Sequence, residues 1–389
     1  MKIYVIPATY NEKGNIERLI TVMEEEVFPK IKKHDMYILV ADDNSPDGTA
    51  EEVKKLMKKY KNLDVNIGEK KGLGASYLRV MSDAIENRNA DAVLNIDGDL
   101  QHDPRSIPDF LQKLDEGYDI VTGSRYSKGG SMPHNWPLYR KVFSIGANTL
   151  ARLISGRFYL HDWTGSYRVY RKEVFLKERT ALRPFSGYTF QAAALYKAAI
   201  LGFKITEVPI HFRSRKIGDS KIAPSEYIYN FFKYMVTERL RELERFIKFL
   251  FVGGTGFIFQ LIVQEGSVLF GASNPIAVAL GAESAIISNF MLNNFWTFND
   301  TNQIKERGNF IGRLAKFNIA SIGAIFIQFA AYWIAEIILG PEIVLLSYII
   351  PTRIAVLIPT IIILVIPLNY FIYNKVIWRT DRLKQKRNS

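Results

Sequence analysis

Short apolar runs alternate with amphipathic stretches over the first third of the chain. The apolar runs predict strands at residues 4–6, 37–40, 65–67, 92–96 and 120–121. The stretches between them carry apolar residues at helical spacing and predict helices at 15–27, 50–59, 75–85 and 104–114. Strands and helices that alternate in this way are typical of an α/β fold, in which helices cover a mostly parallel sheet. Ligands of such folds bind at the carboxyl ends of the strands.

The hydrophobic pattern changes after about residue 245. Long apolar stretches follow at 249–271, 275–297, 317–339 and 354–373, each close to the ~20 residues that a membrane helix needs. Lys and Arg are frequent before the first stretch, between the second and third, and after the fourth, but absent from the other two loops. The positive-inside rule then predicts four helices in the cytoplasmic membrane, with both termini and the N-terminal domain in the cytoplasm. Core helices of a large soluble protein would not explain this charge asymmetry.

Residues 225–246 mix aromatic side chains with Lys and Arg at helical spacing. This pattern suits an amphipathic helix that lies in the membrane interface. A helix packed on the soluble domain is the alternative. The sequence therefore predicts three parts, which are an α/β domain at 1–223, an interface segment at 224–245 and an all-α domain with four transmembrane helices at 246–380.

The composition narrows the chemistry. The 389 residues include no cysteine, which excludes disulfides, Cys-zinc sites and thiol catalysis. The five histidines show no HxxH or HExxH spacing, so we do not expect a histidine-based zinc site. A net charge of +12 indicates an anionic partner, such as a nucleic acid, an anionic lipid or a phosphorylated substrate. The opening KIYVIPATY is too short an apolar run for a signal peptide.

Three carboxylates crowd into residues 95–104, NIDGDLQHDP, directly after a predicted strand. Asp97 and Asp99 are two positions apart in an extended segment, so their side chains point to one side of the chain. Paired carboxylates at a strand end suit Mg²⁺ or Mn²⁺, and Gln101 adds a further oxygen ligand. A solvated acidic turn is the alternative. Asp103 precedes a proline and a helical pattern, and it predicts a helix cap instead.

These motifs carry a resemblance to a known family. Residues 1–222 resemble the inverting family-2 glycosyltransferases with a GT-A (Rossmann-like, mostly parallel) fold, and among them the polyprenyl-phosphate mannosyltransferases. From about residue 245 the chain is similar to the GtrA-like membrane domain, in RFIKFLFVGG and NFMLNNFWTF. The N-terminal resemblance rests on nine motifs in family order: PATYNE, ADDNSPDG, KKGLG, DGDLQH, GSRY, NWPLYRK, DWTGSYRVYRKEV, GYTFQ and EVPIHFRSRKIGDSKI.

The resemblance implies roles on the donor side of the site. Asp97, Asp99 and Gln101 would hold a Mg²⁺ or Mn²⁺ ion that bridges the diphosphate. The first motif has one residue more than the usual Pro-x-Tyr-Asn-Glu, which leaves the role of its proline open. The residues implied in nucleotide-sugar binding are Pro7, Tyr10, Glu12, Asp42, Asp43, Asp97, Gly98, Gln101 and Arg125.

The resemblance also implies roles on the acceptor side. Part of the acceptor side falls in the basic segment RSRKIGDSK, where the Arg and Lys side chains would contact phosphate oxygens. A solvated charge run is the alternative for this segment. Stabilisation of the departing diphosphate would fall to Asp99, Arg125, Arg215 and Lys221, the implied catalytic set. The residues implied in binding the acceptor phosphate are Arg140, Ser144, Arg168, Arg215, Ser220 and Lys221.

The expected activity is the inverting transfer of mannose from GDP-mannose to dolichyl or another polyprenyl phosphate. The expected partners are these two substrates and the lipid bilayer, and not nucleic acid. One alternative is the same chemistry with UDP-glucose or UDP-N-acetylglucosamine and undecaprenyl phosphate. A second is a lipid-glycan flippase with a regulatory soluble domain, because Glu265, Glu283 and Glu336 lie in or near the predicted spans.

Overall fold

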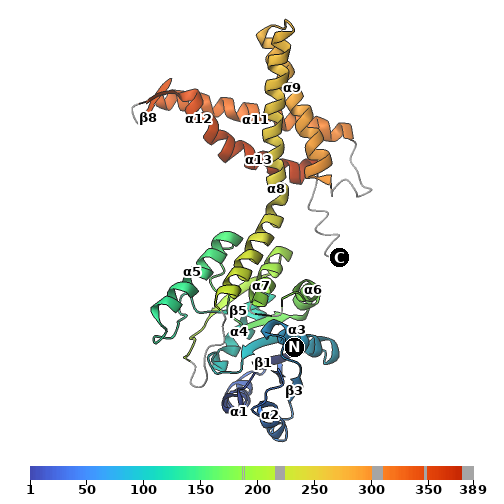
Figure 1. The fold of residues 1–389 in the computed structure, drawn as a ribbon, viewed down its shortest axis with the longest axis vertical. Helices are drawn as coiled ribbons and strands as arrows, with labels where there is room; N and C mark the ends of the chain where they lie inside the picture. The colour runs from blue at the N-terminus through green and yellow to red at the C-terminus, as the bar shows by residue number, and fades with distance from the viewer. Residues whose placement is uncertain (186, 188, 215–223, 300–309, 346–347, 379–389) are drawn as a thin grey trace. The chain divides into compact units, whose positions relative to one another are not determined.

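The computed structural model describes the chain outside six short stretches, and Figure 1 shows its elements. It separates into two compact units, Met1–Leu240 and Arg241–Ser389. We treat each unit by itself. The described residues are 1–185, 187, 189–214, 224–299, 310–345 and 348–378.

The first unit contains a seven-stranded sheet with the order β3-β2-β1-β4-β6-β5-β7. All neighbouring strands are parallel except β6, which runs antiparallel to both β4 and β5. The alternating pattern thus predicted the sheet correctly. The strands are β1 (Lys2–Thr9), β2 (Asp35–Asp42), β3 (Leu63–Ile67), β4 (Ala92–Asp97), β5 (Ile120–Ser124), β6 (Arg168–Arg171) and β7 (Ile205–Pro209).

Helices cover both faces of this sheet, as expected for an α/β fold (Figure 1). One apolar core joins the sheet to α1 (Lys13–Val22), α2 (Thr49–Leu56) and α4 (Ile107–Asp115). The other core lies on the opposite face and includes residues of five further helices. These helices are α3 (Leu73–Ser82), α5 (Leu138–Ser155), α6 (Lys172–Leu182), α7 (Thr189–Leu201) and the first part of α8 (Pro224–Leu269).

The start of α8 packs on the first unit. Phe231 and Met235 are fully buried in the core that contains α6 and α7, and Tyr234 lies edge-on to Tyr196 of α7, 6.4 Å between ring centroids. Tyr229 on the same helix is 64% exposed. This part of the predicted interface segment thus packs on the first unit with one side, and its place in a membrane interface stays a prediction.

The second unit is mainly helical. Three helical stretches in the described part of the chain are long and apolar enough to cross a membrane: Tyr229–Leu269, Phe310–Leu339 and Ile358–Ile377. The predicted span 275–297 forms α9 (Asn274–Leu292), which is not among them. Three of the four predicted spans therefore meet the length and composition of a membrane helix in the described residues, and the span predicted at 275–297 stays a prediction. The further elements are α11 (Phe310–Leu339), α12 (Thr352–Thr360) and α13 (Ile366–Ile372).

A short hairpin interrupts this helical unit between α11 and α12. Its strands β8 (Glu342–Leu345) and β9 (Tyr348–Pro351) pair antiparallel. Thr352 closes the hairpin by donating from its backbone N to Pro341 O at 2.9 Å and from Oγ1 to Gly340 O at 2.6 Å. The sequence analysis did not predict these strands, which lie between the third and fourth predicted spans, 317–339 and 354–373.

Candidate functional site

The carboxylate motif begins where β4 ends. Asp97 is the last residue of the strand, and Asp99 follows in a tight turn in which Leu100 takes a positive φ of 62°. An added Cβ on Gly98 would lie 2.9 Å from Ala8 O of the neighbouring β1, so only glycine lets the turn lie this close to that strand. The turn thus keeps both carboxylates at the carboxyl edge of the sheet.

The surroundings of Asp97 are polar but carry little positive charge. Its Oδ1 accepts hydrogen bonds from Ser166 Oγ at 2.7 Å and from Tyr77 OH at 3.3 Å. His102 Nδ1 lies 3.5 Å from Oδ2, but burial lowers the pKa of this histidine. Burial raises the pKa of Asp97, and the neighbouring charge of Asp99 adds to this rise. Within the described residues, no Lys or Arg is ion-paired with Asp97.

Asp103 caps the helical turn that follows it, as its position before a proline and a helical pattern predicted. Its Oδ1 accepts a hydrogen bond from Arg105 N at 3.1 Å and caps the 3₁₀ turn that begins at Pro104. Arg213 Nη2 binds its other oxygen. Arg213 also pairs with Gln101 through its backbone, because Gln101 Nε2 donates to Arg213 O at 3.0 Å. The capping role of Asp103 is confirmed.

The donor side of the site lies at the ends of β1 and β2. Lys70 Nζ lies over the ring of Tyr10, 3.5 Å from its centroid. Glu12 Oε2 accepts a hydrogen bond from Asn15 Nδ2 at 2.8 Å, next to the start of α1. Asp43 follows β2, is almost buried and forms an ion pair with Arg79 at 3.0 Å. The roles of Tyr10, Glu12 and Asp43 in nucleotide binding stay predictions.

Two residues predicted to contact the nucleotide are buried at the strand ends. Asp42 is fully buried, and its carboxylate accepts hydrogen bonds from Thr9 Oγ1 at 2.9 Å and from Ser45 N and Oγ at 2.9 and 2.6 Å. This carboxylate holds the strand ends together. Pro7 lies inside β1 opposite Ile96 and is buried. The roles of Asp42 and Pro7 in nucleotide binding stay predictions.

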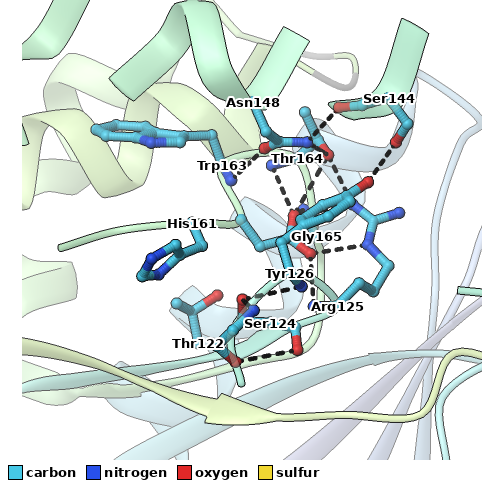
Figure 2. A network of polar contacts seen from close by, with 12 residues as sticks. Thr122, Ser124, Arg125, Tyr126, Ser144, Asn148, His161, Trp163, Thr164 and Gly165 are labelled. Carbon is cyan, nitrogen blue, oxygen red and sulfur yellow. Dashed lines mark hydrogen bonds and ion pairs between the residues drawn. The ribbon is translucent and has the colours of Figure 1, made fainter. Parts of the chain in front are cut away.

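A polar network surrounds Arg125, which directly follows β5 (Figure 2). Its Nε and Nη2 donate to the two oxygens of Asp162 at 2.7 and 2.8 Å, and Nη2 also donates to Thr164 Oγ1 at 2.7 Å. Burial alone would raise the pKa of Asp162, but Arg125 holds it below its usual value. The pair is therefore ionised. Asp162 compensates the positive charge of Arg125, the residue that the sequence analysis expected to bind phosphate.

Helix α5 forms the neighbouring wall of this network. Ser144 Oγ lies 2.5 Å from Tyr126 OH, and Asn148, one turn later, accepts a hydrogen bond from Trp163 N at 2.7 Å (Figure 2). Arg140 lies over the ring of Trp136, 4.0 Å from its centroid. The helix also carries exposed apolar side chains, which are Leu138, Tyr139, Val142, Phe143, Ile145, Leu150 and Leu153.

Arg168 lies inside the fold of the first unit. It is fully buried at the start of β6 and donates to Thr122 Oγ1 at 2.9 Å, to Trp163 O at 3.0 Å and to Gln191 O. A guanidinium with these partners joins β5, β6 and α7, and its role in binding the acceptor phosphate stays a prediction. Arg215, Ser220 and Lys221 lie outside the described residues, so their predicted roles stay predictions.

Comparison with known proteins identifies the family. Residues 4–178 match the family model described as glycosyl transferase family 2, and residues 248–378 match GtrA/DPMS, transmembrane domain. A dolichol-phosphate mannosyltransferase of Pyrococcus furiosus is 34% identical over 86% of this chain and 90% of its own. The chain belongs to glycosyltransferase family 2, in the group of the dolichol-phosphate mannosyltransferases.

Other relatives cover less of the chain. A polyprenol monophosphomannose synthase of Mycolicibacterium smegmatis is 37% identical to this glycosyltransferase over 59% of this chain and 84% of its own. Among solved structures, a mannosyltransferase from Pyrobaculum calidifontis in complex with GDP-Man and Mn²⁺ is 15% identical, covers 82% of this chain and 80% of its own, and has a TM-score of 0.37. The GtrA/DPMS match and the three apolar helices make this glycosyltransferase a membrane protein.

Several residues of the site were not assigned from the sequence. His102, Tyr126, Asn148 and Ser166 all contact predicted site residues. Asn148 could have been found, because it lies four residues after Ser144 and so on the same face of a helix. Ser166 lies in the motif DWTGSYRVYRKEV, where its Oγ donates to Asp97 Oδ1, whereas Thr164 Oγ1 of the same motif accepts from Arg125.

The donor set fits a hard divalent cation. Asp97 and Asp99 are close enough for the charge of one to affect the pKa of the other, and both lie at the carboxyl edge of the sheet. The described residues contain no cluster of three or more His, Cys, Asp or Glu side chains that could hold a metal by themselves. Mg²⁺ is often bound by one or two carboxylates together with substrate phosphates and water, which matches a site with two carboxylates.

Proposed function

We propose that this glycosyltransferase transfers mannose from GDP-mannose to dolichyl or another polyprenyl phosphate, with inversion at the anomeric carbon. The observation that carries the proposal is the turn at 162–168, which contacts both halves of the site. Ser166 donates to Asp97 in the carboxylate motif, and Thr164 contacts Arg125 and Asn148 of α5. A charged donor site thus adjoins a helix with a polar side and an apolar, exposed side.

The apolar side of α5 supports a lipid acceptor. Leu138 and Phe143 are 76% and 65% exposed, and Arg140 and Lys141 lie between them in the sequence. Exposed apolar and basic side chains on one helix suit a surface of anionic lipid headgroups. The acceptor phosphate would then arrive beside Arg140 and Ser144 while its chain stays in the bilayer. We propose that the first unit and both termini lie on the cytoplasmic side, where sugar nucleotides are made available.

The reaction makes modest demands on acid-base chemistry. A phosphate monoester with a second pKa near ~6 is already largely dianionic at neutral pH, so the acceptor oxygen needs no strong general base. The protein has to hold two anions in line and stabilise the leaving diphosphate. A Mg²⁺ or Mn²⁺ ion held by Asp97 and Asp99, with Gln101 beside them, would neutralise charge on the leaving group.

The protein residues then act by orientation. Asp162 fixes the guanidinium of Arg125 by two hydrogen bonds, which presents a rigid group at the strand end. Ser166 and Tyr77 fix Asp97 from the other side. Ser144 is held by Tyr126 on the wall nearest the proposed acceptor. Each side chain is therefore positioned by a partner before the substrates bind, which lowers the entropy cost of reaching a reactive geometry.

A panel of nucleotide sugars tests this proposal. The full-length protein in detergent or vesicles is offered radiolabelled GDP-mannose, UDP-glucose or UDP-N-acetylglucosamine, each with dolichyl or undecaprenyl phosphate. We expect transfer of mannose to a polyprenyl phosphate in the presence of Mg²⁺ or Mn²⁺. Preferred transfer of glucose or N-acetylglucosamine would reject the mannose assignment but keep the reaction class. No transfer from any donor to either lipid would reject the reaction class as well.

A further inference from the structure

Arg79 of α3 reaches across the end of the sheet to Asp43, the carboxylate that follows β2. Its Nη2 lies 3.0 Å from Asp43 Oδ1 and also donates to the backbone oxygen of Asp42 at 3.3 Å. The other terminal nitrogen, Nη1, donates to Asn66 O at 2.9 Å and to the side-chain oxygen of Asn66. The guanidinium is therefore held by groups from β2 and β3 at once.

The backbone is shaped to admit this side chain. An added Cβ on Gly68, the residue after β3, would lie 2.4 Å from Cζ and Nε of Arg79. Gly68 N also donates to Asp42 O at 3.0 Å, which ties the ends of β2 and β3 together. A glycine at this point lets the guanidinium lie flat against the strand ends. The arrangement fixes one rotamer of a long side chain that would otherwise have many.

The position of Asp43 points to the nucleoside. It lies at the carboxyl end of a parallel strand, next to the first and third strands, where ligands of open α/β sheets bind. A carboxylate accepts hydrogen bonds only, and the N–H groups on the edge of a nucleobase are donors. Guanine presents two neighbouring N–H donors there, whereas uracil presents a single N–H between two carbonyl oxygens. A fixed carboxylate therefore favours guanine.

We propose that Arg79 is a positioning residue, which holds the carboxylate of Asp43 in the orientation that binds the base of the donor nucleotide. This inference rests on the proposed function, because it takes a nucleoside diphosphate sugar as the ligand. Burial raises the pKa of Asp43, and Arg79 counteracts that effect, so the ion pair also favours the charged, accepting form. Arg79 itself need not touch the nucleotide.

Three variants and one control test this role in the full-length protein. Arg79→Met removes the ion pair, Arg79→Lys keeps the charge, and Gly68→Ala displaces the guanidinium without changing it. Arg88→Met is the matched control. Arg88 has a side chain 28% exposed, against 27% for Arg79, and it pairs with Asp64 of β3 and with Asp83, the residue after α3. General loosening of α3 against β3 would affect both arginines alike.

We expect Arg79→Met to weaken GDP binding and raise the KM for the donor about tenfold, the size of a typical coupling between contacting residues, and to leave kcat within about twofold. Gly68→Ala should act in the same direction, and Arg79→Lys should recover part of the affinity. In Asp43→Asn, adding Arg79→Met should cause no further loss. GDP binding is measured by calorimetry, independently of turnover.

Other results would overturn the inference. They are an unchanged GDP affinity in Arg79→Met, a fall in kcat with an unchanged KM, additive losses in the double variant, or equal losses in Arg88→Met. Failure of the proposed function would look different. If the wild-type protein bound UDP and not GDP, the donor assignment would fail, and the same four variants would then test the role of Arg79 with UDP.

Discussion

Arg125 and Asp162 form a bidentate ion pair at the end of β5, with Nε to Oδ2 at 2.7 Å and Nη2 to Oδ1 at 2.8 Å. Asp162 is fully buried and also accepts hydrogen bonds from the backbone N of Arg125 at 3.1 Å and of Gly165 at 3.1 Å. One carboxylate thus fixes both the strand end and the turn that carries Ser166. The pair connects the stability of the first unit to the geometry of its site.

Removing one partner of this pair should destabilise the protein strongly. Asp162→Ala leaves the charge of Arg125 uncompensated in a buried position, which costs about 3–5 kcal/mol in comparable cases. We expect a large fall in the thermal unfolding temperature and loss of transfer activity. The control is Lys172→Met, which breaks the exposed pair with Asp91 and should cost less than about 1 kcal/mol. An equal fall in unfolding temperature in the two variants would show that the buried pair contributes no more to stability than the exposed pair.

Asp99→Asn should abolish the metal-dependent part of the reaction. A neutral amide binds a divalent cation less well than a carboxylate, so we expect transfer to fall by at least about 100-fold, as for lost charge stabilisation elsewhere. The assay titrates Mn²⁺ against transfer from radiolabelled donor, and binding of Mn²⁺ is followed separately by electron paramagnetic resonance. Asp103→Asn is the control, because asparagine caps a helix as well as aspartate does. Wild-type turnover of Asp99→Asn at saturating metal would exclude a role for Asp99 in metal binding.

We expect the stability of the first unit to depend on pH through Glu178. It is almost completely buried in α6, and this burial raises the pKa of its carboxyl well above 4.5 despite nearby cations. The folded state binds the proton of Glu178 more tightly than the unfolded state does. The contribution of Glu178 to stability is therefore complete below pH 4.5 and is lost as the pH rises through the folded-state pKa. Glu178→Gln removes this titration. The variant should be more stable than wild type at about pH 8 and close to it at about pH 4.

Thermal unfolding of the full-length protein across this pH range measures the effect. Glu173→Gln, on an exposed glutamate of the same helix, controls for the loss of one negative charge. A wild-type protein that gains stability relative to Glu178→Gln as the pH rises would show the opposite sign. That result would mean that the carboxylate form of Glu178 is the one that the fold stabilises.

The exposed face of α5 should matter for lipid acceptors and not for folding. Phe143→Ser replaces a side chain that is 65% exposed, so the unfolding temperature should change little. Transfer to a long-chain polyprenyl phosphate in vesicles should fall by up to about 100-fold, because burying a phenylalanine side chain in an apolar phase is worth about 2–3 kcal/mol. Transfer to a short-chain soluble acceptor should stay near wild type. The control is Leu176→Ser, an exposed apolar residue of α6. Equal losses with both acceptors would place the defect in catalysis.

The local sequence predicted the sheet and the carboxylate motif well. Strand positions follow from apolar runs that are short and bounded by turn residues, which favours strands over helices, and five of the seven strands of the sheet were expected. Asp103 was assigned correctly because a helix cap is a local hydrogen bond between residues two apart. The family motifs supplied the order of the site along the chain, and the curated relatives confirm the family.

Long-range pairing decided the rest. Arg168, Arg125 and Asp42 look alike as charged residues near strand ends. Arg168, however, is buried against the Thr122 hydroxyl and two backbone oxygens, Arg125 is bound by Asp162, and Asp42 accepts from Thr9 and Ser45. Ser45 lies three residues after Asp42 in a local turn, but Thr9, Asp162 and Thr122 are more than thirty residues from the charges that they contact, and no spacing in the sequence indicates them. The sequence by itself determined which residues end the strands and what chemistry they carry. Only the tertiary structure decided which of these charges are satisfied inside the protein, because compensation of a buried charge depends on what packs against it.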